Sequence, residues 1–358
     1  MKTLLRYGFL LLGICSFGQI PAGYYNNATG TGYALKTQLF NIIKNHTVKP
    51  YANLYTCYLT SDRDYFYEND GTVLDIYSEK PNGTDSYVFS ATNANDRCGN
   101  YAVEGDCYNR EHLMPQSVFD ESLPMVSDPH HIVPTDGKVN GMRSNYPFGV
   151  VANPTWTSTN GCKLGNNSTP GYTAIVFEPI DEFKGDVARC LLYFATRYQN
   201  TIANYDHPML NNTTDQAFSN WFLSILLQWH AQDPVSAREI ARNNAIYAYQ
   251  NNRNPFIDHP EYVCTIWSNA CSLRNGEFDA IANAAVYPNP AVGNRFFVQS
   301  DVELETIEVY NVNGQRVREL RNPASNNGAV EISDMPAGFY LLKLSYKGQT
   351  AVKKVIVQ

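Results

Sequence analysis

The distribution of Cys, His and Trp divides this chain into two parts of different kinds. After Asn283 the sequence contains none of these three residue types, and it alternates apolar and polar residues in short runs instead. Such alternation is typical of half-buried strands. A length of 358 residues also favours two domains. We therefore predict a mixed α+β domain over residues 19–275 and a small all-β sandwich over residues 276–358.

The first 18 residues read as a cleavable secretory signal. Lys2 and Arg6 precede an apolar run, and small residues follow that run. The run is shorter than the roughly 20 residues that a membrane-spanning helix needs. A lipoprotein signal would use Cys15, but Ile14 before it is larger than such sites accept. We expect an exported protein without membrane insertion that passes through the periplasm.

Seven cysteines follow the predicted signal, in a compartment where disulfides can form. Sequence spacing favours two pairs, Cys98 with Cys107 and Cys264 with Cys271. Closing loops of this length adds about 2 to 3 kcal/mol each in the chain-entropy model. An odd number leaves at least one thiol unpaired. Zinc binding is the alternative, but the chain contains no C-x-x-C spacing.

The charge balance is acidic and argues against tight nucleic-acid binding. Residues 19–275 carry 17 Lys and Arg against 25 Asp and Glu, a balance of −8, and residues 276–358 carry 8 against 9, a balance of −1. An enzyme that acts on a polyanion can still be acidic if a bound cation and a few arginines supply the local positive field. Phosphate chemistry is therefore not excluded.

Apolar periodicity predicts helices in the first domain. They are expected at residues 32–46, 184–200, 215–232 and 233–252, the last with Asp233 as N-cap and Pro234 at the first helical position. Short strands are expected at residues 71–78 and 172–180. In the tail, Asn313-Gly314 between alternating runs predicts a hairpin with a type I′ turn, and Lys347-Gly348 marks a second.

Two neighbouring stretches are dense in groups that bind metal or phosphate. "YNREHLMPQSVF" at residues 108–119 places Glu111 beside His112, a pairing that by itself is more often two solvated side chains. About twenty residues later, "SDPHHIVPTDGKVNGMRSNYPFG" adds two histidines with carboxylate, amide and arginine side chains. Their density and proximity favour a shared site.

These residue types suit phosphodiester hydrolysis. The reaction needs a base to deprotonate water and a cation or arginine to hold the phosphorane charge. A histidine is mostly neutral at pH 7, and carboxylate and amide oxygens suit magnesium. Of Glu111 and His112, one could bind the metal and the other the water, with Asn140 completing the cation's shell.

Four blocks of the chain resemble the bacterial endonuclease I family, secreted or periplasmic nucleases of the ββα-metal (His-Me finger) type. They are "NREHLMPQS", "SDPHHIVPTDGKVNGMRSNYPFG", "KGDVARCLLYFATRY" and "WHAQDPVSAREIARNNAIYAYQNNRNPFIDHPEY", in the family's order. The resemblance covers nearly all of residues 20–267. It implies a nuclease that cleaves DNA, and often RNA, with little sequence preference and leaves 5′-phosphates.

The same resemblance implies roles for particular residues. His112 would be the general base, with Glu111 and Asn140 the ligands of magnesium, in whose place manganese or calcium could stand. The family also holds the scissile phosphate with an arginine, for which Arg143 is the first candidate and Arg110 the second. His130 would support the site by hydrogen bonding, and His131 is expected to be structural or exposed.

Other polar residues have simpler interpretations. Arg253, Asp258 and His259 are expected to form a hydrogen-bonded cover. Arg189 is expected to pair with Asp186 or Glu178 rather than face phosphate. The remaining aromatic helix residues, Trp221 and Trp229 with His230, are expected in the core.

The tail resembles the C-terminal sorting domain of type IX secretion cargo. The resemblance rests on "VYPNP", the following strands, "DMPAGFYLLKL" and the basic "VKKVIVQ" ending. It implies delivery outside the cell by that machinery, and an ordinary β-sandwich binding module is the alternative. We predict a secreted, monomeric enzyme with DNA and RNA as substrates; the rivals are an extracellular ribonuclease with little DNA activity and an inactive nucleic-acid-binding surface protein.

Overall fold

The computed structural model describes residues 20–268, 270–271, 281, 284–300, 302–326, 328–346 and 349–358. The chain divides into two compact units, Met1–Ser268 and Asn269–Gln358. The predicted signal, the boundary between residues 275 and 276 and the Lys347-Gly348 turn lie outside the described residues. Across the ranges given above, no helix combines the length and apolarity needed to cross a bilayer.

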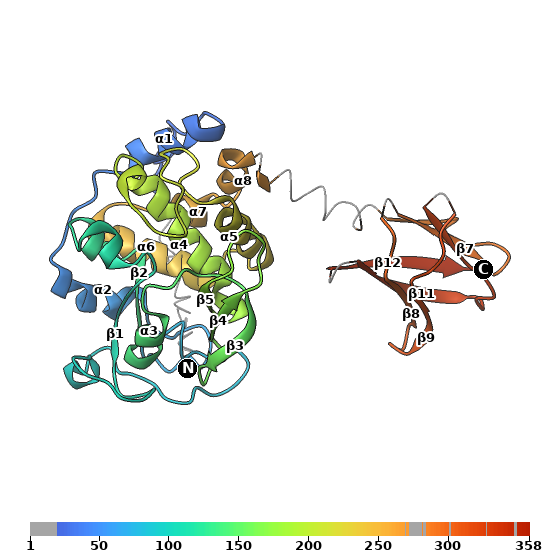
Figure 1. Ribbon diagram of the computed structural model, residues 1–358, viewed down its shortest axis with the longest axis horizontal. Coiled ribbons are helices and arrows are strands. Elements are labelled where there is room, and N and C mark those ends of the chain that lie inside the picture. Colours follow the sequence, from blue (N-terminus) through green and yellow to red (C-terminus); the bar gives the residue numbers. More distant parts are fainter. Residues whose placement is uncertain are drawn as a thin grey trace, which may run out of the picture. The chain divides into compact units, whose positions relative to one another are not determined.

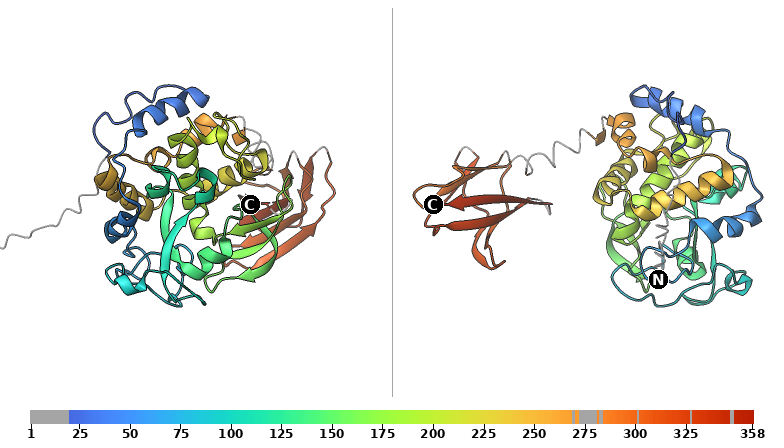
Figure 2. Two further views of the ribbon diagram at one scale, coloured as in Figure 1. Left: turned by 60° about the vertical axis from the view of Figure 1, so that its left-hand side comes forward. Right: turned by 180° about the vertical axis from the view of Figure 1, so that it is seen from behind.

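Most helices of the first unit gather on one side, whereas α3 lies among the strands (Figures 1 and 2). The helices of this unit are α1 (Gly32–Ile43), α2 (Leu54–Ser61), α3 (Gly137–Arg143), α4 (Lys184–Arg197), α5 (Asn220–Gln232), α6 (Ala237–Gln250), α7 (Pro255–Asp258) and α8 (Tyr262–Ile266). The apolar periodicity of residues 184–200 predicts one buried face for α4, but more of the helix is buried than that face. Every residue of α4 after Lys184 is buried, because α1, α5 and α7 all pack against it.

The start of α6 differs from the prediction. Ser236, not Asp233, is the N-cap, and its side chain accepts a hydrogen bond from the Glu239 amide in a full capping box. Asp233 instead lies at the C-terminal end of α5, where its Oδ2 accepts a 2.7 Å hydrogen bond from the Gly185 amide. The capping box satisfies two helix donors at once, which explains why the helix begins at Ala237.

Two small antiparallel sheets complete the first unit. They comprise β1 (Tyr108–His112) with β2 (Ile132–Asp136), and β3 (Val151–Thr157), β4 (Lys163–Asn167) and β5 (Ile175–Glu178) in the order β3-β4-β5. The strand predicted at residues 172–180 is confirmed as β5. The strand predicted at residues 71–78 is wrong, since Asp75 closes a turn there by accepting the amides of Ser78 and Glu79 at its carbonyl.

Strands in the described part of the second unit form two antiparallel sheets. They are β6 (Ala285–Tyr287), β7 (Phe296–Gln299), β8 (Thr306–Asn311), β9 (Arg316–Arg321), β10 (Ala329–Ile332), β11 (Gly338–Tyr346) and β12 (Gln349–Val357), in the orders β10-β7-β6 and β12-β11-β8-β9. Alternate side chains of both sheets form one apolar core, as the alternating sequence predicts. The β8–β9 turn is not type I′, because only Gly314 of the predicted pair has a positive φ, +75°.

Both predicted cysteine pairs consist of disulfide-bonded residues. Cys98 is bonded to Cys107, and Cys264 and Cys271 are each disulfide-bonded. Cys57, Cys162 and Cys190 are free and buried. Burial raises the pKa of each of these three thiols to about 12, so they act as small apolar core residues.

Candidate active site

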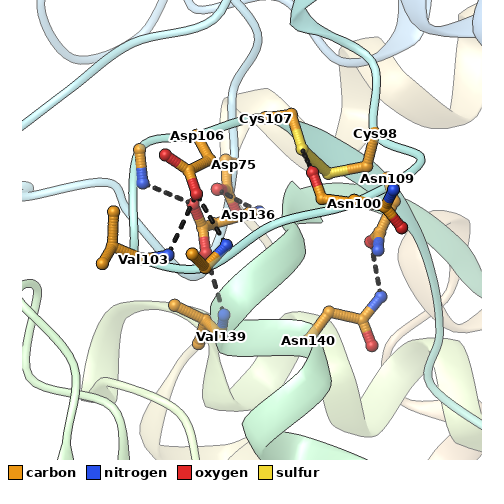
Figure 3. The surroundings of a disulfide bond; sticks show 12 residues. Asp75, Cys98, Asn100, Val103, Asp106, Cys107, Asn109, Asp136, Val139 and Asn140 are labelled. Atoms are coloured by element: carbon orange, nitrogen blue, oxygen red, sulfur yellow. Dashed lines mark hydrogen bonds between the residues drawn. A yellow bond between two sulfur atoms is a disulfide. The ribbon is translucent and has the colours of Figure 1, made fainter.

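Strands β1 and β2 and helix α3 form one continuous ββα unit. In the antiparallel register, Glu111 lies opposite Val133 and His112 opposite Ile132. Asp136, the last residue of β2, caps α3 by accepting a 2.8 Å hydrogen bond from the Val139 amide (Figure 3). The ladder and the cap together fix the distance between the end of β1 and the first turns of α3.

One cavity of about 480 Å³ lies between β1 and α3. Its lining includes Glu111, His112 and Asn140 together with Arg110 and Arg143. The three groups predicted to act on one cation therefore share a single cavity. Further lining residues are Tyr51, Cys98, Gly99, Tyr101, Asn109, Pro115, Gln116, Gly141, Ser144 and Asn145.

Glu111 is a buried carboxylate with only part of its hydrogen-bonding capacity used. Its Oε1 accepts a 2.9 Å hydrogen bond from the Tyr77 hydroxyl and lies 3.2 Å from Nη1 of Arg143. Burial raises the pKa of Glu111 to about 7, although Arg143 and Tyr77 both oppose that rise. Both of these contacts go to Oε1, so Oε2 is available to bind a ligand in the cavity.

His112 is held as a neutral imidazole. Its Nε2 lies 3.3 Å from the carbonyl of Val126. A carbonyl only accepts, so the ring proton is on Nε2 and the lone pair on Nδ1. Burial, reinforced by His131 and Arg110, lowers the pKa of His112 to about 3. The ring is therefore in its proton-accepting form throughout the neutral range.

Asn140 is oriented by a neighbour on β1. Its Nδ2 donates a 2.6 Å hydrogen bond to Oδ1 of Asn109, and Figure 3 shows the two amides facing each other between β1 and α3. With its amino group occupied in this way, Asn140 presents its carbonyl oxygen as the free end of the amide. Such an oxygen is a ligand for a hard cation.

The two arginine candidates occupy different environments. Arg143 is 1% exposed, and it donates to the carbonyls of His112 at 2.9 Å and Leu113 at 2.6 Å besides pairing with Glu111. These contacts favour a positioning role. Arg110 is half-buried, and its guanidinium lies 3.6 Å from the ring centroid of Tyr51, which leaves it better placed to meet a phosphate.

His130 and His131 are both fully buried behind the cavity. Nε2 of His130 lies 3.1 Å from the Asn252 carbonyl, and its ring packs on Tyr193 with a centroid distance of 4.5 Å. Nε2 of His131 lies 2.9 Å from the Met125 carbonyl. Neither histidine lines the cavity. His130 therefore belongs to the scaffold beneath the site, and His131 is structural rather than exposed.

Two residues that orient the site were not predicted from the sequence. Asn109 had a usable signal, since it lies two positions before Glu111 and alternate strand residues share a face. Tyr77 had none, because it precedes Glu111 by 34 positions and the two meet only through the fold.

The donor set fits a hard divalent cation. Glu111 offers a buried carboxylate oxygen and Asn140 an amide oxygen, ligand types that magnesium, manganese and calcium share. The raised pKa of Glu111 also shows that Arg143 does not fully offset the burial of this carboxylate. A bound cation would supply the missing positive charge.

Comparisons with known families cover both units. A family model described as Endonuclease I matches residues 31–261, and one described as a secretion system C-terminal sorting domain matches residues 285–358. Both resemblances found in the sequence are thereby confirmed.

Individual relatives carry related names. Two proteins named extracellular ribonuclease, from Bacillus amyloliquefaciens and Bacillus subtilis (strain 168), are each 35% identical over 250 residues, which span 68% of this chain and 78% of theirs. A protein named endonuclease-1 from Buchnera aphidicola subsp. Baizongia pistaciae is 26% identical over 132 residues, 37% of this chain and 46% of its own.

Proposed function

The chain belongs to the endonuclease I family, and from this we propose that it is a magnesium-dependent endonuclease that hydrolyses DNA and RNA with little sequence preference. Family membership makes it a nuclease, and the sorting domain makes it a secreted one. We assign catalysis to residues 19–275 and secretion to residues 276–358. The observation that carries the proposal is the single cavity lined by Glu111, His112 and Asn140.

His112 is the proposed general base. Its Nδ1 accepts a proton from a water molecule, and the resulting hydroxide oxygen forms the new bond to phosphorus. The bond from phosphorus to the 3′ oxygen breaks, and that oxygen takes up a proton from a solvent water molecule and leaves as a 3′ hydroxyl. The products therefore carry 5′-phosphates. The contact between Nε2 and the Val126 carbonyl keeps the lone pair on Nδ1.

Glu111 and Asn140 are the proposed ligands of the magnesium ion. When bound, the ion offsets negative charge on the phosphorane and the leaving oxygen. Arg143 acts as a positioning residue, because it holds Glu111 and the carbonyls of residues 112 and 113. Arg110, stacked on Tyr51, is the proposed contact for the scissile phosphate.

A ribonuclease with little DNA activity is the second candidate. The names of the two Bacillus relatives favour it. Discrimination of the 2′-hydroxyl depends on groove shape rather than on the residues that perform hydrolysis. We expect cleavage of both nucleic acids, since the proposed base, cation ligands and phosphate contact involve no 2′-hydroxyl.

The test uses the full chain on three substrates in parallel: supercoiled plasmid, single-stranded DNA and structured RNA. We expect all three to be cut with magnesium and none with EDTA, with activity restored by excess magnesium. Cleavage of RNA alone would favour the second candidate. Binding without cleavage under every condition would indicate an inactive surface protein and overturn the proposal.

A further inference from the structure

A second group of acidic residues lies outside the cavity, in the long segment between α2 and β1. Carboxylate oxygens of Asp64, Glu68 and Glu79 all lie within 4.8 Å of one another. Asp64 is 2% exposed and Glu79 is 1% exposed, whereas Glu68 lies on the surface. The proposed reaction uses none of these residues.

Glu79 shows that this group is not an ordinary solvated acidic face. Its Oε1 is buried and has no hydrogen-bond partner. A buried polar atom without a partner is costly, and a charged one more so. Burial and then Asp85, Glu68 and Asp64 raise the pKa of Glu79 to about 9, so its charged neighbours are carboxylates as well.

Asp64 retains some capacity to bind a ligand. Its Oδ1 accepts the amides of Phe66 at 3.0 Å and Tyr67 at 2.9 Å, which uses both lone pairs. Its Oδ2 accepts the Asn69 amide at 3.1 Å and keeps one lone pair. The loop is thus already organised by Asp64, which keeps one lone pair for a further ligand.

We propose that Asp64, Glu68 and Glu79 bind a structural calcium ion. Calcium takes oxygen ligands at about 2.3 to 2.6 Å, so ligands on opposite sides of one ion lie about 4.8 Å apart. The three oxygens therefore fit one calcium shell. Magnesium is usually held by only one or two carboxylates and keeps several waters, so a group of three carboxylates favours calcium. Secretion places the protein where calcium sites of about 10⁻⁴ to 10⁻³ M affinity are filled.

The calcium ion would hold a segment that also supports the cavity. Glu79 follows Tyr77, whose hydroxyl donates to Glu111, by two residues. Asp75, earlier in the same segment, accepts a 2.7 Å hydrogen bond from the Asp136 amide at the cap of α3. The role is structural, because the three carboxylates do not line the cavity.

The test measures calcium binding by the full chain in millimolar magnesium chloride, which occupies the proposed catalytic site. After EDTA treatment and dialysis, equilibrium dialysis counts bound calcium and a thermal melt reports stability. At a calcium concentration 100 times the Kd, we expect the wild-type chain to bind one calcium ion more than Glu68→Gln or Glu79→Gln does, and its Tm to rise by about 5 °C more than theirs.

Glu303→Gln is the matched control, because it removes an exposed carboxylate from the second unit. It should bind calcium as the wild type does. Glu68 lies on the surface, so Glu68→Gln decides the question if Glu79→Gln fails to fold. Calcium binding by either cluster variant at the wild-type level would overturn the proposal. So would an absence of bound calcium in the wild type, which would indicate a proton shared by Glu68 and Glu79. Since no readout involves cleavage, the result is independent of the proposed function.

Discussion

The two units of this chain use opposite kinds of core. The first unit buries many charged side chains, among them Asp128, Arg143, Arg189 and Arg242, whereas Ser300 is the only buried polar residue in the described part of the second unit. Buried ion pairs rarely increase net stability over apolar packing. The contrast indicates that the buried charges of the first unit fix the relative positions of its helices and strands. In the second unit, apolar packing alone maintains the fold.

Arg242 shows what such a charge does. Its Nε donates a 2.7 Å hydrogen bond to Asp62, and its Nη2 donates to the carbonyls of Pro129 at 2.6 Å and Ile132 at 3.1 Å. Helix α6 is thereby tied to the end of α2 and to the first residue of β2. Strand β2 pairs with β1, so these contacts of Arg242 help to hold the register that aligns Glu111 and His112.

The largest expected effect is on the activity of a His112 variant, whose stability should change little. We expect His112→Ala to lower kcat/KM for plasmid cleavage by about 10²- to 10⁴-fold, the usual effect of losing a general base. Its Tm should stay close to that of the wild type. His259→Ala, at a half-exposed histidine that does not line the cavity, is the control and should cleave normally. Near-normal nicking by His112→Ala would refute the assignment.

Stability should distinguish buried charges from exposed ones. Arg242→Ala leaves Asp62 buried without its closest charged partner, so we expect a loss of about 3 to 5 kcal/mol in the free energy of unfolding. Urea unfolding followed by tryptophan fluorescence measures it, since all four tryptophans lie in the first unit. Arg316→Ala removes an exposed pair with Glu308 in the second unit, and it should not measurably shift the thermal transition of that unit, followed by circular dichroism because residues 276–358 contain no tryptophan. Equal effects would contradict the contrast.

The smallest effect concerns the residue that holds Glu111. Tyr77→Phe removes one hydrogen bond to the proposed metal ligand, so we expect about tenfold more magnesium to be needed for half-maximal cleavage. Tyr67→Phe is the matched control, because that hydroxyl donates to Glu182 instead. A magnesium requirement that changes equally in both variants would indicate general loosening of the segment.

The sequence predicted well those features that depend on short stretches. Alternation predicted the strands of the second unit, and 3.6-residue periodicity predicted α1, α4 and α5. The Glu111–His112 pair and Asn140 lie in two adjacent blocks that the β1–β2–α3 unit brings together. Where one side chain competes with periodicity, prediction failed. Asp75 turns residues 71–78 away from a strand, and Ser236 moves the start of α6.

Long-range partners were the least predictable feature. Arg189 was expected to pair within its own region, but its main partner is Glu239 of α6 at 2.5 Å, and Asp186 lies farther away at 3.8 Å. Arg253, Asp258 and His259 were expected to form one hydrogen-bonded cover. Arg253 does pair with Asp258 at 2.6 Å, whereas His259 contacts Glu261 at 3.0 Å. The sequence could not show that Arg143 is buried and Arg110 half-buried, because the exposure of an arginine depends on the whole fold around it.

Helix α3 illustrates a limit on engineering this protein. A Cβ on Gly137 would lie 2.5 Å from the sulfur of Cys98, and one on Gly141 would collide with the Tyr101 ring. Glycine within a helix costs about 1 kcal/mol relative to alanine, so replacing these residues is the obvious route to a more heat-resistant enzyme. Here these substitutions are excluded, because a side chain at either position would collide with the disulfide loop. That loop packs directly against α3, the helix that carries the proposed metal ligand Asn140.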